Sequence, residues 1–362
     1  MGEYSKFISE KRRSVPTPKS IADERGRCVF GTFESEFEEL DLVRLKRPTR
    51  APQAFNKLKL TLWEAVEVNL PDGMFLAACC DMGLIGKCVH LFFDKRTRKV
   101  YNFDATLKPR VAAVAGNLLG GSVTRAVFAD GEIEFVNTFE AGVCRVSGRH
   151  KNGNGDVIEY GFELSRVSRP SVVSIPFPHS NNRPLYSQKD LFEANGHIVV
   201  NGRRMDTDGQ CTAVVDDHKG FYPRRAHYDW VTTMGKLDID GESRFFGLNL
   251  TRNQSVDQRD YNENLIWLEG ATSLLPPVTF EREPKCNKFD GSATWRVTDE
   301  YDMVNVALNV VGINPMVIHA LVVSIDYYVA FGTMSGYVRD ENGKKYILDG
   351  MAGMGEDKTL LL

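Results

Sequence analysis

The chain has 362 residues, of which 42% are hydrophobic and 26% charged, and its formal net charge is -3. A chain of this length normally folds as two domains, because a single core stops growing at about 250–300 residues. The small net charge argues against a broadly basic surface, so we expect no nucleic-acid partner.

No apolar run is long enough for a transmembrane helix, and the first residues lack the apolar core of a signal peptide. We therefore expect no transmembrane segment and a cytoplasmic location. Seven cysteines stand at irregular spacings without a Cys-x-x-Cys pair, which indicates reduced core thiols rather than structural zinc. The glycine-rich segments 116–121 and 350–355 lack the strand–loop–helix setting of a dinucleotide site, and we expect no cofactor.

In chain order, residues 1–24 are polar and basic, and we expect a loosely ordered arm. From residue 57 onward, short runs alternate polar and apolar residues as half-exposed strands do. Turn sequences separate these runs and lie at 94–98, 130–131, 152–155, 201–202, 240–241 and 341–343. The pattern predicts an all-β protein of two tandem antiparallel barrels with few short helices, spanning 25–170 and 191–362.

Residues 171–190 lie between the two arrays. Prolines within and next to this segment argue against a central strand or a long helix, so we expect a linker. An alternative is a linker that also contributes to a ligand pocket where the barrels meet. The donors that favour this alternative are Asn181, Arg183 and Tyr186.

The stretch 214–235 combines many charges with large aromatic residues, a mixture that suits the wall of a pocket better than a surface turn or a core strand. Asp216 and His218 are two residues apart and share one face of a strand. A carboxylate beside an imidazole is a candidate acid–base pair. The alternative is that Asp216 accepts structural bonds from Arg225 or from the backbone. We assign ligand-binding roles in this stretch to Tyr222, Arg225, His227, Tyr228 and Trp230.

A second polar group precedes the apolar run 265–268. Glu263 would face the cavity beside Trp267, and burial would make it a candidate proton donor; the alternative is an ordinary polar turn. Asn249 and Asn264 are further candidate ligand contacts. His218, His227 and Asp229 match no known metal-ligand spacing, so we predict no metal site.

Four segments in this order and spacing resemble a family described as a domain of unknown function: 178–189, 216–230, 246–250 with 262–270, and 336–357. That family is similar to the hydroxyneurosporene synthase (carotenoid hydratase) and AttH-type proteins. The resemblance implies two lipocalin-like barrels. Asp216, Gly220, Arg225 and Trp230 match the central motif, whereas Asp229 stands where the family has asparagine.

These features together predict binding of a small hydrophobic molecule such as an isoprenoid or a lipid. If the protein also converts this molecule, we expect cofactor-independent hydratase- or cyclase-type acid chemistry, with Asp216, His218 and Glu263 as the proton-handling residues. The alternative is a non-catalytic lipid carrier or scaffold of the same fold. The sequence does not specify the ligand or the oligomeric state.

Overall fold

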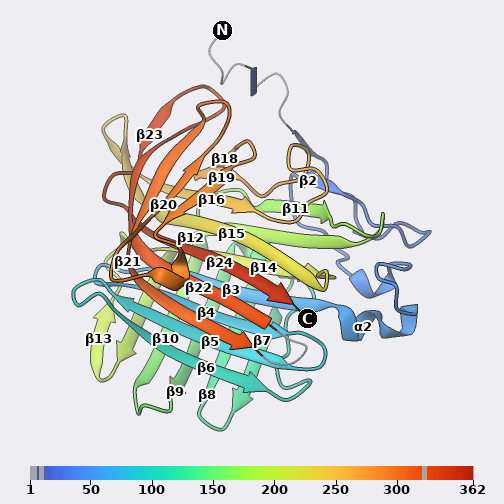
Figure 1. Ribbon diagram of the computed structural model, residues 1–362, viewed down its shortest axis with the longest axis horizontal. Helices are drawn as coiled ribbons and strands as arrows, with labels where there is room; N and C mark the ends of the chain where they lie inside the picture. Colours follow the sequence, from blue (N-terminus) through green and yellow to red (C-terminus); the bar gives the residue numbers. More distant parts are fainter. Residues whose placement is uncertain (1–5, 8–11, 320–323, 362) are drawn as a thin grey trace. The chain divides into compact units, whose positions relative to one another are not determined.

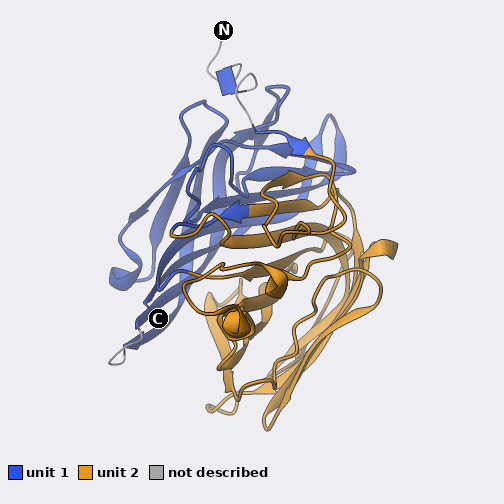
Figure 2. Cartoon of the chain, turned by 90° about the vertical axis from the view of Figure 1, so that its right-hand side faces the viewer, with its two compact units in different colours: residues 1–14, 175–178, 223–362 blue, residues 15–174, 179–222 orange. Residues whose placement is uncertain are grey.

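The computed structural model describes residues 6–7, 12–319 and 324–361. The chain forms two compact units (Figure 2). Unit 2 comprises residues 15–174 and 179–222, and unit 1 comprises residues 1–14, 175–178 and 223–362. Each unit is built around one curled, nearly closed antiparallel sheet, which confirms the predicted all-β tandem arrangement.

The sheet of unit 2 follows the order β6-β5-β4-β3-β14-β12-β10-β9-β8-β7, with antiparallel pairing at every step (Figure 1). The short strands β1, β2, β11 and β13 pair beside this path. The strands of this sheet are β1 (Ser14–Val15), β2 (Gly31–Phe33), β3 (Thr61–Asn69), β4 (Gly73–Asp81), β5 (Gly86–Asp94), β6 (Lys99–Leu107), β7 (Ser122–Phe128), β8 (Gly131–Thr138), β9 (Val143–Lys151), β10 (Val157–Arg166), β11 (Ser171–Pro176), β12 (Pro184–Val200), β13 (Arg203–Asp206) and β14 (Thr212–Gly220).

The sheet of unit 1 follows the order β18-β17-β16-β15-β24-β22-β21-β20-β19, also antiparallel throughout, with β23 paired to β22. Its strands are β15 (Arg225–Ile239), β16 (Glu242–Arg252), β17 (Leu265–Leu268), β18 (Ala271–Leu274), β19 (Thr279–Glu283), β20 (Ala293–Thr298), β21 (Val304–His319), β22 (Ser324–Arg339), β23 (Lys345–Ile347) and β24 (Ala352–Leu361).

The helical elements named in the structure are short. They are α2 (Asn56–Lys59) and the 3-10 turns η1 (Leu42–Arg44), η2 (Gln53–Phe55), η3 (Phe139–Ala141) and η4 (Cys286–Lys288). The predicted hairpin turns connect paired strands, and two of them show why these residues were informative. Asn201-Gly202 and Asp240-Gly241 adopt positive φ at both positions, as a two-residue hairpin turn requires.

Side-chain alternation gives each sheet a core face. In unit 2, Val66 of β3, Phe192 of β12 and Val215 of β14 join one hydrophobic core. In unit 1, Val231 of β15 and Leu248 of β16 join another. Long segments of β12, β14, β15 and β16 are buried on both faces, so polar residues on the face opposite each core are also removed from water.

The observed boundaries differ from the expected ones. Residues 171–176 and 184–190, expected to be linker, are strand, because Pro176 ends β11 and Pro184 begins β12, where proline removes no central ladder bond. β14 pairs with both β3 and β12. Unit 2, which corresponds to the expected first barrel, therefore extends to residue 222 rather than ending near residue 170.

The expected loose arm lies partly outside the described residues, at 1–5 and 8–11. Its described part includes buried Arg12 and fully buried Ile21, so this part packs on the protein. Among the described residues, the helices are too short or too polar to span a bilayer.

Candidate functional site

The strands β12, β14 and β3 lie side by side and carry most of the polar candidates of unit 2. In their register, Ser187 pairs with His218, and Lys189 pairs with Asp216. Paired residues of neighbouring strands point to the same face of a sheet. These four side chains, here called the 216 cluster, therefore share the face opposite the core that contains Val215.

The polar atoms of the 216 cluster lie close together, as hydrogen-bond and ion-pair contacts. Lys189 Nζ lies 2.8 Å from both Ser187 Oγ and His218 Nε2, and Ser187 Oγ lies 2.8 Å from the same imidazole nitrogen. Asp216 Oδ1 is 3.3 Å from Lys189 Nζ and 3.4 Å from His218 Nε2. The cluster is partly accessible, since the side chain of His218 is 20% exposed and that of Asp216 is 11% exposed.

This geometry constrains where the protons are. A charged Lys189 only donates, so it donates to His218 Nε2, and the neutral imidazole then carries its proton on Nδ1. Ser187 Oγ accepts from Lys189 and lies 2.8 Å from the same imidazole nitrogen. Asp216 Oδ1 is buried and accepts no hydrogen bond from the described residues. The cluster thus combines a carboxylate with spare acceptor capacity and an imidazole beside it.

His218 also has an aromatic neighbour. Trp63 of β3 is its register partner on the other side of β14, so the indole lies on the same face as the imidazole. An indole face attracts a positive charge that develops nearby. This face of the sheet therefore carries a carboxylate, an imidazole and an indole in neighbouring positions.

The core face of the same three strands carries a different acidic group. Asp217 and Lys219 form an ion pair within the barrel, and Glu64 is the register partner of Asp217. Glu64 is fully buried and accepts hydrogen bonds from Thr124 and Asn137. Burial, reinforced by the charge of Asp217, raises the pKa of Glu64 to about 7.

A further buried acid, Asp190, pairs with Val215, two residues before Asp217 on β14. Asp190 is fully buried and faces Arg166 at 2.9 Å, while Arg166 also pairs with Glu36 at 2.5 Å. Gln188 accepts from the Tyr186 hydroxyl and donates to Asp190. Burial raises the pKa of Asp190 to about 7 despite the opposing charge of Arg166.

The buried acids on the core face are residues that sequence reasoning missed, although a signal was present. Ala213 and Val215 are apolar and two residues apart, so strand alternation assigns Asp217 and Lys219 to the core face. Lys189 and Glu64 had no comparable signal, because their importance comes from pairing across strands that are distant in sequence.

The other predicted residues of unit 2 are mainly structural. Arg183 donates to the backbone carbonyls of Phe221 and Tyr222 at 2.6 and 2.9 Å. Asn181 is exposed, whereas its neighbour Asn182 donates to two backbone carbonyls. Tyr222 is half-buried. Tyr186 lies on the core face rather than beside Asp216.

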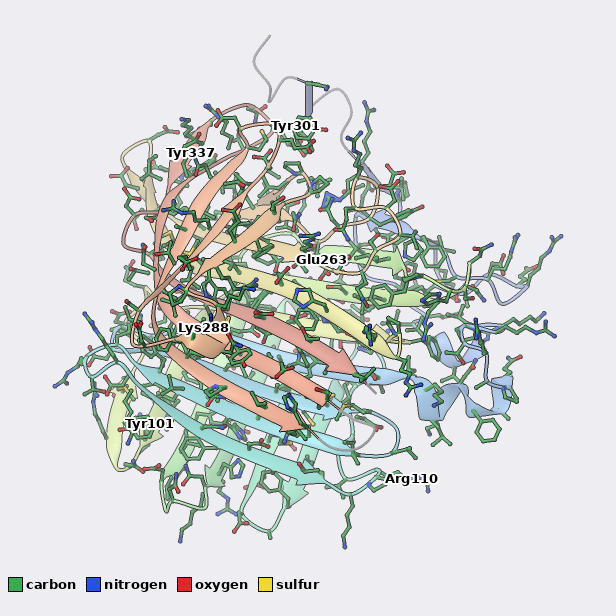
Figure 3. All side chains as sticks on the ribbon, viewed as in Figure 1. Tyr101, Arg110, Glu263, Lys288, Tyr301 and Tyr337 are labelled. Carbon is green, nitrogen blue, oxygen red and sulfur yellow. The ribbon has the colours of Figure 1, made fainter. Side chains whose placement is uncertain are left out.

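In unit 1, Trp230 and Asn249 meet on the face of the sheet opposite the core. Trp230 Nε1 donates to Asn249 Oδ1 at 2.7 Å, and Asn249 Nδ2 donates to the Glu263 carbonyl at 2.8 Å. The Glu263 carboxylate accepts from Asn253 at 2.8 Å. Glu263 precedes β17 on a loop (Figure 3) and is 1% exposed. This group therefore brings three predicted residues together.

Asn264 and Trp267 are buried beside this group. The Asn264 side chain donates to the Pro276 carbonyl and accepts from the Thr251 amide, so it holds the loop in place. Trp267 is fully buried, and its indole N–H has no hydrogen-bond partner among the described residues. Arg225 is exposed at the start of β15, and Tyr228 donates to Glu356 at 3.0 Å.

The remaining polar group of unit 1 surrounds Asp229. Asp229 Oδ1 lies 2.6 Å from Arg282 Nη2 and 3.1 Å from His227 Nε2. Burial opposes the charged form of Asp229, but His227 and Arg282 outweigh it, so the pKa of Asp229 lies below its usual value. The hydrogen bond to Asp229 raises the pKa of His227.

Asp357 lies close to the same group, and His227, Asp229 and Asp357 offer ligand atoms within 4.8 Å of one another. The Arg282 guanidinium contacts both carboxylates. Its fixed positive charge therefore lies beside both acidic side chains of this group.

The comparisons with known proteins fit this architecture. The family profile of a domain of unknown function, DUF2804, matches residues 12–360. No curated protein matches the sequence at a significant level. The fold is similar to that of CghA, solved with Sch210972, at 8% identity and a TM-score of 0.50, over 83% of this chain and 89% of that chain.

Kievitone hydratase from Nectria haematococca also aligns, at 10% identity and a TM-score of 0.49, over 97% of this chain and 98% of that chain. At such identities the CghA similarity describes the fold alone. The family match, in contrast, spans almost the whole chain and segments of both units. This protein therefore belongs to the DUF2804 family.

Proposed function

We propose that this protein binds a small hydrophobic molecule, of isoprenoid or lipid type, and hydrates or cyclises it by acid chemistry without a cofactor. The observation that carries the proposal is the 216 cluster, in which a carboxylate, an imidazole, an ammonium and a hydroxyl meet on one face of β12 and β14. The fold similarity to CghA, a protein solved with Sch210972, supports an architecture that accepts a small molecule.

The chemistry needs one proton donor and one proton acceptor. In the protonated state, Asp216 gives its proton to one carbon of a carbon–carbon double bond, which leaves a cation on the other carbon. Water, or a second double bond of the same molecule, attacks that cation. His218 Nε2 or the Asp216 carboxylate then takes the proton released from water or from the adjacent carbon.

Neighbouring residues give this pair its geometry. Lys189 binds both Asp216 and His218, so it acts as a positioning residue. Trp63 offers its ring to the cationic intermediate. Separately, within unit 1, Glu263 is buried and bound to Asn253, and it is a second candidate proton donor.

The test is turnover of a terpenoid and unsaturated-lipid panel by the wild-type protein and by Asp216→Asn and His218→Asn. Loss of a general acid or base typically costs about 10²- to 10⁴-fold in rate, and we expect that loss with little change in melting temperature. Asp206→Asn is the matched control, because Asp206 is an exposed carboxylate that pairs with Arg204.

A carrier of the same fold is the competing function. It is favoured by the contact of Asp216 with Lys189, since an ion pair of this kind also stabilises a structure without catalysis. Native mass spectrometry of protein purified from different hosts distinguishes the two. A co-purifying hydrophobic molecule that no preparation converts supports the carrier, and turnover abolished by Asp216→Asn supports the enzyme.

A further inference from the structure

An exposed apolar patch on unit 2 consists of residues that do not belong to the candidate site. Phe55 is 49% exposed, Leu58 43%, Leu84 65% and Ile85 46%. These four side chains, here called the 55–85 patch, come from the η2–α2 turn and from the loop between β4 and β5. Grouped apolar exposure of this kind marks an interaction surface, whereas single exposed apolar residues need no explanation.

The two segments lie against each other. A Cβ atom added to Gly83 would meet the Leu58 carbonyl oxygen at 2.5 Å, so the backbone at 83 packs directly on the backbone at 58. Gly83 also has a φ of 79°, which favours glycine. The close approach places Leu58 beside the loop that carries the exposed Leu84 and Ile85.

The fold holds this surface outward. Asn56 is fully buried and donates to the carbonyls of Val43 and Leu45 at 3.1 and 2.8 Å. Leu45 and Leu60 pack into a core of unit 2. Leu45 and Leu60 therefore anchor this segment in the core. Phe55 and Leu58 instead face solvent, at the end of the unit where α2 lies (Figure 1).

The surroundings of the patch are strongly basic. Residues 42–63 contain no aspartate or glutamate. They contain Arg44, Lys46, Arg47, Arg50, Lys57 and Lys59, all exposed. Within the described part of the chain, Arg44 has a distant contact with Glu39 at 3.9 Å, and the other five cations form no ion pair.

We propose that the 55–85 patch docks on an anionic lipid surface. Apolar side chains would enter the acyl boundary while the surrounding cations meet the headgroups, the arrangement by which peripheral proteins bind membranes. The six exposed cations of residues 42–63 outnumber the bordering Asp41 and Asp81. This excess of positive charge favours an anionic surface over a second copy of the chain, whose own basic segment would repel it. The proposal is independent of the proposed function, although a bilayer would also supply hydrophobic substrates.

The test is co-sedimentation of the full chain with vesicles of phosphatidylcholine alone and of phosphatidylcholine mixed with phosphatidylserine. We expect at least about tenfold stronger binding to the anionic vesicles, weakened by salt. Phe55→Ser with Leu84→Ser should remove binding to both, and Lys57→Glu with Lys59→Glu should remove the preference for phosphatidylserine.

Val123→Ser with Val127→Ser is the matched control, because these β7 residues are 42% and 53% exposed but lie outside the basic segment. This variant should bind vesicles as the wild type does. Equal binding of all variants, or absence of binding to either vesicle, would overturn the proposal. So would concentration-dependent dimerisation that Phe55→Ser with Leu84→Ser abolishes, since it would assign the patch to a second copy. Vesicle binding and turnover test different proposals, so a negative result in one assay does not decide the other.

Discussion

At the scale of single residues, Asp229 shows how a departure from a family pattern is accommodated. The expected asparagine would supply a side-chain donor, whereas aspartate supplies a charge. Arg282 lies 2.6 Å from that charge and stacks over Trp295 at 4.5 Å, so the carboxylate is both paired and enclosed. This contact assigns Asp229 a structural role in unit 1 that the sequence did not indicate.

Trp230 gives a prediction at the same scale. It is 4% exposed and donates to Asn249, so Trp230→Ala should lower the free energy of unfolding by roughly 3–5 kcal/mol. Trp230→Phe keeps most of the packing but leaves Asn249 Oδ1 unpaired, and should cost about 1–3 kcal/mol. Urea denaturation measures both. A Trp230→Ala protein as stable as the wild type would show that the indole contributes neither packing nor the hydrogen bond.

At the scale of elements, the turn residues and the polar–apolar alternation were enough to predict an antiparallel all-β fold, whereas β11 and the first part of β12 fell in the expected linker. The boundary between the units was not predictable, because it depends on β14 pairing with β3, which is about 150 residues earlier in the chain. The faces were only partly predictable. Alternation separated Asp216 from Asp217, but the residues that complete each group, such as Lys189 and Glu64, come from other strands.

The three central strands of unit 2 also predict a pH dependence of stability. Burial raises the pKa of Glu64 to about 7, so between its ordinary pKa and about pH 7 the folded protein holds a proton that the unfolded chain has released. Stability therefore falls as the pH rises through this window. Glu64→Gln should flatten the fall by about 1–3 kcal/mol between roughly pH 5 and pH 8.

Urea unfolding at several pH values checks this prediction, with the exposed Glu163→Gln as control. The slope should be reduced rather than abolished, because burial raises the pKa of Asp190 to about 7 as well. Glu64→Gln should leave vesicle binding unchanged. Identical pH profiles for Glu64→Gln and the wild type would show that Glu64 does not hold a proton in the folded state.

At the scale of the whole molecule, the order of the chain does not follow the division into units. Unit 1 comprises residues 1–14, 175–178 and 223–362, whereas unit 2 occupies the rest of the sequence between them. Phe7 is buried in the core of unit 1 beside Tyr301, with ring centroids 5.6 Å apart. Arg12 donates to the carbonyls of Asn262 and Asn264.

These contacts predict that the N-terminal segment stabilises unit 1. Phe7→Ala should cost roughly 3–5 kcal/mol as a core truncation, and Arg12→Ala removes the bonds to two buried carbonyls, at about 1–3 kcal/mol for each group left unpaired. Three of the four tryptophans, at positions 230, 267 and 295, belong to unit 1, so intrinsic fluorescence mainly reports that unit. The fluorescence midpoint in urea should therefore move to lower concentration in both variants and stay in place in the exposed control Arg13→Ala. Midpoints that match the wild type in Phe7→Ala and Arg12→Ala would mean that unit 1 is stable without its N-terminal segment.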